Sequence, residues 1–286
     1  MKFATDRFTL VKKIISRICI YFTLLLGMFF SLLPLVTVLF ASLKTEKEYN
    51  LTSALAAPQH WLNFQNFAVV WTRARIPLAF KNTLIILIFT LLGSIISGTM
   101  IAYVLSRFSF KLNVFLKGVF LFANLIPGVT MQVGTYNIMV SLNLVNSIPG
   151  IILLYTGTDI IAIYIFLQFF ESIPTSLDES AILDGASYFK IFFRVLFPLL
   201  KPAIATVIIL KGVSVYKEYY MANLYLQSKT KYVTMSTTLY TFTGEYGNQY
   251  NLICAGVILS IIPILLAFIF LQKYIYSGLT QGAVKE

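Results

Sequence analysis

Residues 171–202 read ESIPTSLDESAILDGASYFKIFFRVLFPLLKP, a charged and helix-forming stretch inside a strongly apolar chain. Ser176 and Glu179 have the spacing of a capping box, in which a hydroxyl and a carboxylate three residues apart each satisfy an unpaired amide. Asp178 and Glu179 also fall in the first helical turn, where the helix dipole favours negative charge. Gly185 can adopt the left-handed conformation that ends short helices. The pattern predicts a short helix that stops at a tight bend.

A second helix is expected after the bend. Ser187 can cap its start, and Lys190, Arg194 and Lys201 fall along one face at about 100° per residue. The stretch is too polar to cross a bilayer and too structured for a loop. We therefore expect residues 171–202 to contact a partner.

The rest of the chain has the composition of a membrane protein. It is 58% hydrophobic and only 12% charged, about half the charge of a soluble domain. A bilayer needs roughly 20 apolar residues per helix, and six stretches qualify. We predict an all-α polytopic membrane protein in which residues 1–286 form a single domain with six transmembrane helices. The predicted spans are residues 18–41, 83–106, 114–135, 148–170, 203–222 and 252–275.

The first predicted span follows basic residues and resembles a signal sequence. At roughly 23 residues, with Pro34 inside it, it is long for the apolar region of a signal peptide. We expect an uncleaved first helix.

If the N-terminus is cytoplasmic, the cytoplasmic loops contain more lysines and arginines than the external loops, as is usual for membrane proteins. This pattern places both termini and residues 171–202 of a multi-pass protein in the cytoplasm, with His60 and Asn248 outside. Basic loops on an anionic leaflet account for the net charge of +11, so no nucleic acid partner is expected.

No catalytic constellation is visible in the sequence. The phosphate-cradling pattern GxxxxGK[ST] is absent. The chain has one histidine, His60, which is too few for a zinc ligand set. Because His60 falls in a predicted external loop, no nucleophile–histidine pair is visible either. Cys19 and Cys254 fall in predicted spans, where thiols act as small apolar residues. We expect a non-catalytic protein without cofactor or metal.

The loop also carries a resemblance to a known family. Glu179-Ser180-Ala181, then three residues, Gly185, nine residues and Val195-Leu-Phe-Pro198 resemble the EAA loop of binding-protein-dependent ABC importers, whose pattern is EAA-x3-G-x9-I-x-L-P. The departures are Ser180, Val195 and Phe197, which are small or apolar changes.

Other segments are similar to the carbohydrate-uptake permeases of the maltose-permease type. They extend from the first loop to the tail of the chain. These segments are DGAS at 184–187, PLLKPAIAT at 198–206, PQHW at 58–61, Asn66-Phe67, KNT at 81–83 and GLTQGAVK at 278–285.

The resemblance implies a mechanism and a set of partners. In the family the short helix of this loop docks into a cytoplasmic ATPase, whose ATP-driven closure moves the spans. The implied partners are a second permease subunit, a dimer of ABC ATPases, an extracytoplasmic solute-binding protein, an oligosaccharide and membrane lipid. A helix that merely lies on the membrane is the alternative reading of the loop. The residues expected to couple to the ATPase are Ser176, Glu179, Ser180, Ala181, Asp184, Gly185 and Pro198.

The substrate path has fewer signals. Lys211 lies deep in the fifth predicted span, where an ionisable group suggests a functional site; a snorkelling or carbonyl-paired lysine is the alternative. Tyr216, Glu218 and Tyr219 offer hydroxyls, a carboxylate and rings that suit a sugar. An aromatic belt at the lipid headgroups explains these tyrosines as well.

We therefore expect the membrane-spanning permease subunit of an ATP-driven ABC importer for a sugar or oligosaccharide; amino acids or peptides stay open as substrates. One alternative is an ion-coupled secondary transporter, which would need intramembrane carboxylates, and only Asp159 lies near a span interior. The other alternative is a membrane scaffold that transports nothing.

Overall fold

The structure, a computed structural model, describes residues 2–157, 159–244 and 247–283. It is built almost wholly from helices, as expected, and divides into two compact units. One unit holds α1 to α3 and the chain from Tyr240 to Leu259; the other holds Ala74–Leu239 and the later part of α15. The prediction of a single membrane domain stays a prediction, and Val284 and Lys285 of the tail lie outside the described residues.

Three helices are long and apolar enough to cross a membrane, counted over the described residues. They are α1 (Lys2–Leu43), α4 (Ile76–Arg107) and α15 (Tyr250–Ala283), which contain the first, second and sixth predicted spans. The third and fourth predicted spans fall on bent helix pairs. The fifth, residues 203–222, begins within α12 (Lys201–Lys217), the second half of a third bent pair, and runs past the end of that helix into α13 (Tyr220–Tyr225). The described chain has up to six spans if each pair is one span.

The first bent pair joins α5 (Asn113–Asn124) to η1 (Gly128–Met131) and α6 (Gln132–Ser141) at 92°. The second joins α7 (Ile148–Thr156) to α8 (Ile160–Ser172) at 47°. The third bends by 72° between Leu199 and α12 (Lys201–Lys217). The remaining elements are α2 (Glu46–Leu51), α3 (Gln65–Arg73), α9 (Ser176–Leu183), α10 (Tyr188–Ile191), the π-helical turn η2 (Phe192–Leu196), α11 (Phe197–Leu199), α13 (Tyr220–Tyr225), α14 (Met235–Thr238), η3 (Leu239–Phe242), and the antiparallel strands β1 (Thr243–Gly244) and β2 (Gly247–Asn248).

Buried amides organise the first unit at the end of α1. The Asn66 side chain donates to the carbonyls of Ser42 and Lys44 at 2.8 and 2.7 Å, and Asn251 donates to the Asn66 side chain at 3.1 Å. The last carbonyls of a helix have no partner within it. Asn66 therefore satisfies the orphan carbonyls at the C-terminal end of α1 and fixes α3 against it.

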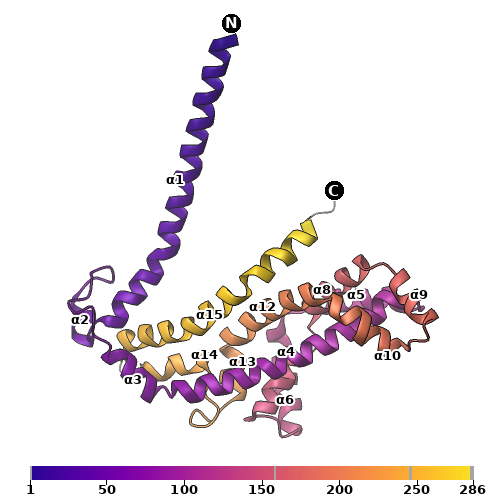
Figure 1. The fold of residues 1–286 in the computed structure, drawn as a ribbon. Coiled ribbons are helices and arrows are strands. Elements are labelled where there is room, and N and C mark those ends of the chain that lie inside the picture. The colour runs from indigo at the N-terminus through magenta and orange to yellow at the C-terminus, as the bar shows by residue number, and fades with distance from the viewer. Residues whose placement is uncertain (1, 158, 245–246, 284–286) are drawn as a thin grey trace. The chain divides into compact units, whose positions relative to one another are not determined.

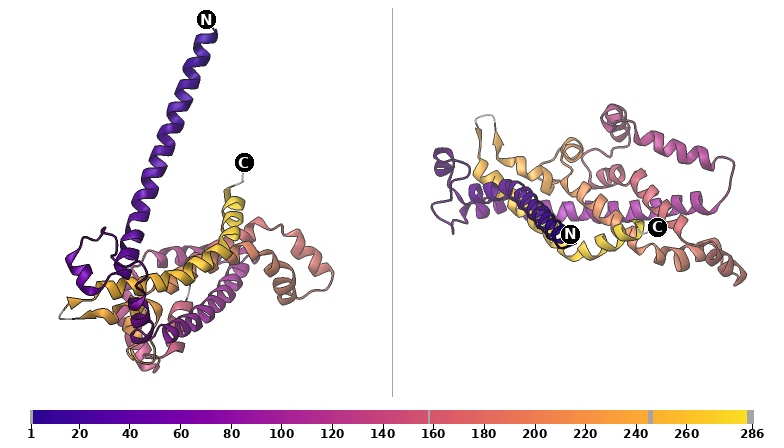
Figure 2. Two further views of the ribbon diagram at one scale, coloured as in Figure 1. Left: turned by 60° about the vertical axis from the view of Figure 1, so that its left-hand side comes forward. Right: turned by 90° about the horizontal axis from the view of Figure 1, so that it is seen from above.

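The core of the second unit forms where α4 packs against α8, α7 and α12 (Figure 1). Small residues on α4 allow this close approach, since a β-carbon at Gly98 would lie 3.2 Å from the Phe166 ring of α8. Ala102 and Phe166 are fully buried in this cluster. Both views of Figure 2 show the 171–202 segment at one end of α4.

Candidate functional site

The 171–202 segment is tied to the C-terminal end of α4 by Arg107. Its guanidinium Nη2 donates to the carbonyl of Ile173 at 2.9 Å, and its Nε lies 3.2 Å from Asp178 Oδ2 on α9. Arg107 Nε and Asp178 Oδ2 form no hydrogen bond with each other or with another atom of the described structure. Their contact is therefore an ion pair without hydrogen-bond geometry. Only 8% of the Arg107 side chain and 14% of that of Asp178 are exposed. This largely desolvated contact, hereafter the tether, holds α9 to α4.

The start of α9 lacks the predicted capping box. The residue before the helix is Thr175, at φ −65° and ψ −22°, and no side chain caps this end. Because Thr175 already has helical angles, Ser176 lies inside the helix, where its carbonyl accepts the Ser180 hydroxyl at 2.8 Å. The prediction that Ser176 caps the helix through a capping box is wrong. Asp178 and Glu179 do lie in the first turn, as predicted.

The end of α9 has the expected left-handed glycine. Gly185 has φ +73°, and its amide donates to the carbonyl of Ile182 at 2.9 Å. The next amide, of Ala186, donates to the carbonyl of Ala181 at 3.0 Å. These two bonds form a Schellman motif around Asp184 and Gly185. Ala181 and Ala186 pack against the core, which is the apolar contact that accompanies such motifs.

After the bend, Ser187 caps α10 by accepting from the amide of Lys190, as predicted. The chain then passes through the π-helical turn η2 and α11, which contains Pro198, and bends by 72° before α12. The predicted common face of Lys190, Arg194 and Lys201 assumed one straight α-helix and is wrong for Lys201, which lies beyond the bend. Phe192 and Leu196 of the π-helical turn are buried in the core, and π-helical turns often mark functional sites.

Aromatic rings pack this second helix against α4. The Tyr103 ring lies 5.2 Å from Phe192 and 5.8 Å from Phe170, measured between centroids. Phe108, just after α4, lies 5.2 Å from Tyr188 of α10. Ring pairs at these separations add stability beyond simple burial.

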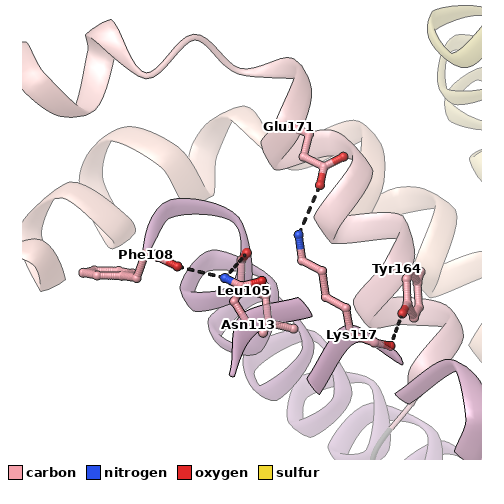
Figure 3. A network of polar contacts seen from close by, with 6 residues as sticks. All are labelled: Leu105, Phe108, Asn113, Lys117, Tyr164 and Glu171. Atoms are coloured by element: carbon pink, nitrogen blue, oxygen red, sulfur yellow. Dashed lines mark hydrogen bonds and ion pairs between the residues drawn. The ribbon is translucent and has the colours of Figure 1, made fainter. Parts of the chain in front are cut away.

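A polar network beside the loop fixes the turn that follows α4 (Figure 3). The Asn113 side chain donates to the carbonyls of Leu105 and Phe108 at 3.0 and 2.8 Å, which satisfies acceptors at the end of α4. The Tyr164 hydroxyl of α8 donates to the carbonyl of Lys117 at 2.6 Å, and Lys117 Nζ lies 3.6 Å from Glu171. The network joins α4, α5 and α8 directly before the loop begins.

The outer side of the loop exposes apolar and acidic side chains. Leu183 at the end of α9 is 88% exposed and Phe189 of α10 is 69% exposed, while Glu179 is exposed as well. Two large apolar side chains and a carboxylate are thus open on an anchored segment that lies outside the predicted spans. The geometry therefore supports a docking helix, α9, whose other side is fixed to α4 by the tether. The rings of Tyr103, Phe170 and Phe192 fix the helix that follows it.

The predicted substrate-path residues fall into different surroundings. Lys211 Nζ lies 3.0 Å from Asp159 Oδ2, and both residues line a cavity of about 210 Å³ between α8 and α12. Lys211 is thus paired with a carboxylate, not with a carbonyl or the membrane surface as the alternative readings expected.

Tyr216 and Glu218 are engaged elsewhere. The Tyr216 hydroxyl donates to the carbonyl of Ser260 on α15 at 3.0 Å, and Glu218 Oε1 accepts from the amide of Met221 at 2.9 Å. Both residues line a small pocket apart from the Lys211 cavity, and Tyr219 is partly buried. Their predicted role in the path stays a prediction.

Comparison with known proteins identifies the family. Residues 94–281 match the family described as binding-protein-dependent transport system inner membrane component. The chain belongs to this family. It is therefore the permease component of such a system, an all-α, multi-pass membrane protein, and no catalytic residue is assigned to it.

The permease is similar to several named permeases. It is 34% identical over 255 residues to the melibiose/raffinose/stachyose import permease protein MelC of Bacillus subtilis (strain 168), covering 88% of this chain and 91% of that protein. It is 30% identical to the arabinooligosaccharides transport system permease protein AraQ of the same organism, covering 89% and 90%. A chain in the crystal structure of a bacterial ABC transporter involved in the import of the acidic polysaccharide alginate has a TM-score of 0.77 at 23% identity, covering 89% of this chain and 95% of that chain, which shows that the fold is shared.

Neither largely buried ion pair was predicted from the sequence. Arg107 and Asp178, like Asp159 and Lys211, lie far apart in the chain, so no local pattern joins them. One signal was available: an ionisable side chain within an apolar span needs a partner, and Asp159 and Lys211 are such residues in neighbouring predicted spans.

Proposed function

We propose that this permease is the membrane-spanning subunit of an ATP-driven importer that translocates a sugar or oligosaccharide delivered by an extracytoplasmic solute-binding protein. A second permease subunit would complete the pathway through the lipid, and a dimer of cytoplasmic ABC ATPases would supply the energy. The observation that carries this proposal is the anchored helix α9 with its exposed end at Leu183.

The coupling mechanism follows from how α9 is held. In the proposal a cytoplasmic ATPase binds the solvent-exposed side of α9, where Glu179 and Leu183 are exposed. The tether to Arg107 then passes motion of α9 to α4, which packs along α8 and α12. Gly185 keeps the helix short, and Pro198 lies before the 72° bend into α12. A tethered helix that ends in a Schellman motif transmits displacement because it has few alternative arrangements.

The proposed orientation places both termini and residues 171–202 in the cytoplasm of a bacterial inner or plasma membrane. The distribution of lysine and arginine supports it. The proposed ATPase contact also requires the loop to lie on the side of the membrane that contains ATP.

The proposed substrate class comes from the relatives. The names of the two permeases compared above refer to melibiose, raffinose, stachyose and arabinooligosaccharides, all of them neutral sugars. We extend this class to the present chain. Tyr216, Glu218 and Tyr219 are proposed to influence the path near the end of α12.

The ion-coupled alternative is disfavoured by the Lys211 pair. Ion coupling in a membrane needs carboxylates that are free to bind a proton or cation. Asp159 is neutralised by Lys211, whose Nζ lies 3.0 Å from Oδ2, so a free cation would meet no net negative charge there.

Copurification tests the proposal. The chain should be extracted from its native host in mild detergent, and every accompanying chain identified. We expect a separate ATPase and a second permease subunit, and ATP hydrolysis only in the assembled complex. Hydrolysis of ATP by the purified chain alone, or a stable preparation without any ATPase, would contradict the proposal.

A further inference from the structure

The Asp159–Lys211 pair lies in an unusual place for two charges. Lys211 is about 15 Å along α12 from Lys201, at 1.5 Å per residue. Asp159 is the N-cap of α8, directly after the break in the bent α7–α8 pair. Of the two side chains, 14% of Asp159 and 21% of Lys211 remain exposed. Charges at such depth face a bundle interior or a water-filled cavity, because exposure to lipid is costly.

The cavity beside this pair is lined by polar groups with unused hydrogen-bonding capacity. An ammonium has three donors, and among the described residues Asp159 is the one partner of Lys211 Nζ. Ser214 lines the same cavity one helical turn further along α12. Its hydroxyl bonds to no residue in the described part of the chain, whereas Thr206 on the same helix donates back to the carbonyl of Pro202 at 3.0 Å. Two lysine donors and one hydroxyl are thus available.

The carboxylate adds acceptors to this set. A carboxylate has about four lone-pair positions, and the described structure uses one on Oδ1 for the amide of Ala162 and one on Oδ2 for Lys211. A neutral ligand with neighbouring hydroxyls could accept from Lys211 and donate to Asp159 at the same time. The pair carries no net charge, so it offers no general attraction for a free anion or cation.

The size and rim of the cavity limit the ligand further. About 210 Å³ is less than the 300 Å³ or more typical of pockets for drug-sized molecules, which favours a single ring over a whole oligosaccharide. Ile161 and Leu210 line the cavity and are exposed. Aliphatic side chains beside hydrogen-bonding groups match a sugar ring, which has hydroxyls at its edge and C–H groups on its faces.

We propose that Asp159, Lys211 and Ser214 form a subsite of this chain that binds one neutral sugar ring of the solute during its passage. The inference rests on the proposed function, because it assumes that the assembled complex imports a sugar. In this proposal the open side of the cavity faces the translocation path and not lipid, because the ion pair would otherwise be exposed to hydrocarbon.

Protection of a cysteine at position 214 tests the subsite with little disturbance of the ion pair. Cys19 and Cys254 are first replaced, and Ser214→Cys is introduced into the whole complex in liposomes with its ATPase and binding protein. The probe is whichever of melibiose, raffinose, stachyose and maltotriose the wild-type complex takes up fastest. The rate of modification by a small thiol reagent is measured during ATP turnover with and without that sugar. Lys217→Cys, on the same helix but outside the cavity, is the matched control.

The subsite predicts that sugar at about three times its half-saturating concentration slows modification at position 214 about fourfold, because only the unoccupied site reacts. Modification at position 217 should not change. Equal rates with and without sugar at position 214, in a complex that takes up that sugar, would overturn the subsite and leave the proposed function intact. If the wild-type complex takes up none of the sugars, the proposed function fails and the subsite fails with it.

One substitution separates a sugar contact from a purely structural ion pair. Ser214→Ala leaves the pair untouched and should lower sugar uptake at low concentration about two- to tenfold, the equivalent of one hydrogen bond. ATP hydrolysis by the complex should persist. Ser141→Ala, whose hydroxyl is bonded to Ile138, is the control for loss of a hydroxyl. Wild-type uptake in Ser214→Ala would overturn the subsite.

Discussion

Replacing Asp178 by asparagine tests whether the tether carries motion from α9 to α4. The substitution keeps the shape of the side chain and removes its charge, so that Arg107 retains the Ile173 carbonyl but loses its anion. Removing one partner of a buried ion pair typically costs about 3–5 kcal/mol. The contact lacks hydrogen-bond geometry, so we expect the lower end, about 3 kcal/mol, which corresponds to roughly a hundredfold change in the opening of α9.

Two measurements on the complex in lipid nanodiscs and liposomes check this expectation. Amide hydrogen exchange across α9 should be roughly a hundredfold faster in Asp178→Asn, because local opening exposes those amides. The amount of sugar transported per ATP hydrolysed should fall, since a loosened helix moves without moving α4.

Glu171→Gln is the matched control. It also neutralises a carboxylate of an ion pair beside the loop, but Glu171 is 56% exposed and its contact with Lys117 is 3.6 Å. Exposed pairs are worth about 0–1 kcal/mol, so exchange in α9 should change by less than about fivefold. Wild-type exchange and wild-type coupling in Asp178→Asn would refute the tether as the route of motion.

Four further outcomes are expected. Gly185→Val should impair transport because a β-branched residue at φ +73° costs about 1–2 kcal/mol, although space for the side chain is open; normal transport would argue against a fixed bend. Glu179→Lys should insert normally and lose ATPase association in a pull-down, and full retention would place the interface elsewhere. Single cysteines should react with an impermeant maleimide in intact cells at Asn248 and not at Asp184, and the reverse pattern would invert the topology. Tyr216→Phe should lower the thermal stability of the complex by about 0.5–1.5 kcal/mol through loss of the bond to Ser260, and an unchanged melting temperature would show that this bond contributes little.

Local signals predicted the parts of the loop that depend on neighbouring residues. The left-handed Gly185 and the cap at Ser187 follow from backbone sterics and a hydroxyl within three residues, and both were confirmed. The prediction that Ser176 caps α9 was wrong because the start of a helix depends on the backbone angles of the preceding residue. Thr175 already has helical angles. The spacing of a capping box therefore does not by itself fix the first residue of the helix.

Features that depend on tertiary packing were not accessible in this way. The π-helical turn forms where Phe192 and Leu196 join the buried cluster that also contains residues of α4 and α8, and it shifts every later residue out of the α-helical period. Lys201 was misplaced for that reason and because of the bend before α12. The family resemblance, by contrast, depends on residue types at fixed spacing, so these departures from a straight helix did not affect it.

ATP-dependent uptake by a reconstituted complex tests the central claim most directly. The chain would be incorporated into liposomes with the ATPase and second permease subunit that copurify with it, and supplied with labelled raffinose and the solute-binding protein. The account predicts uptake that requires internal ATP, the ATPase and the binding protein together, and that continues after ionophores collapse the proton and sodium gradients. Uptake by the chain without an ATPase, abolished by those ionophores, would contradict it.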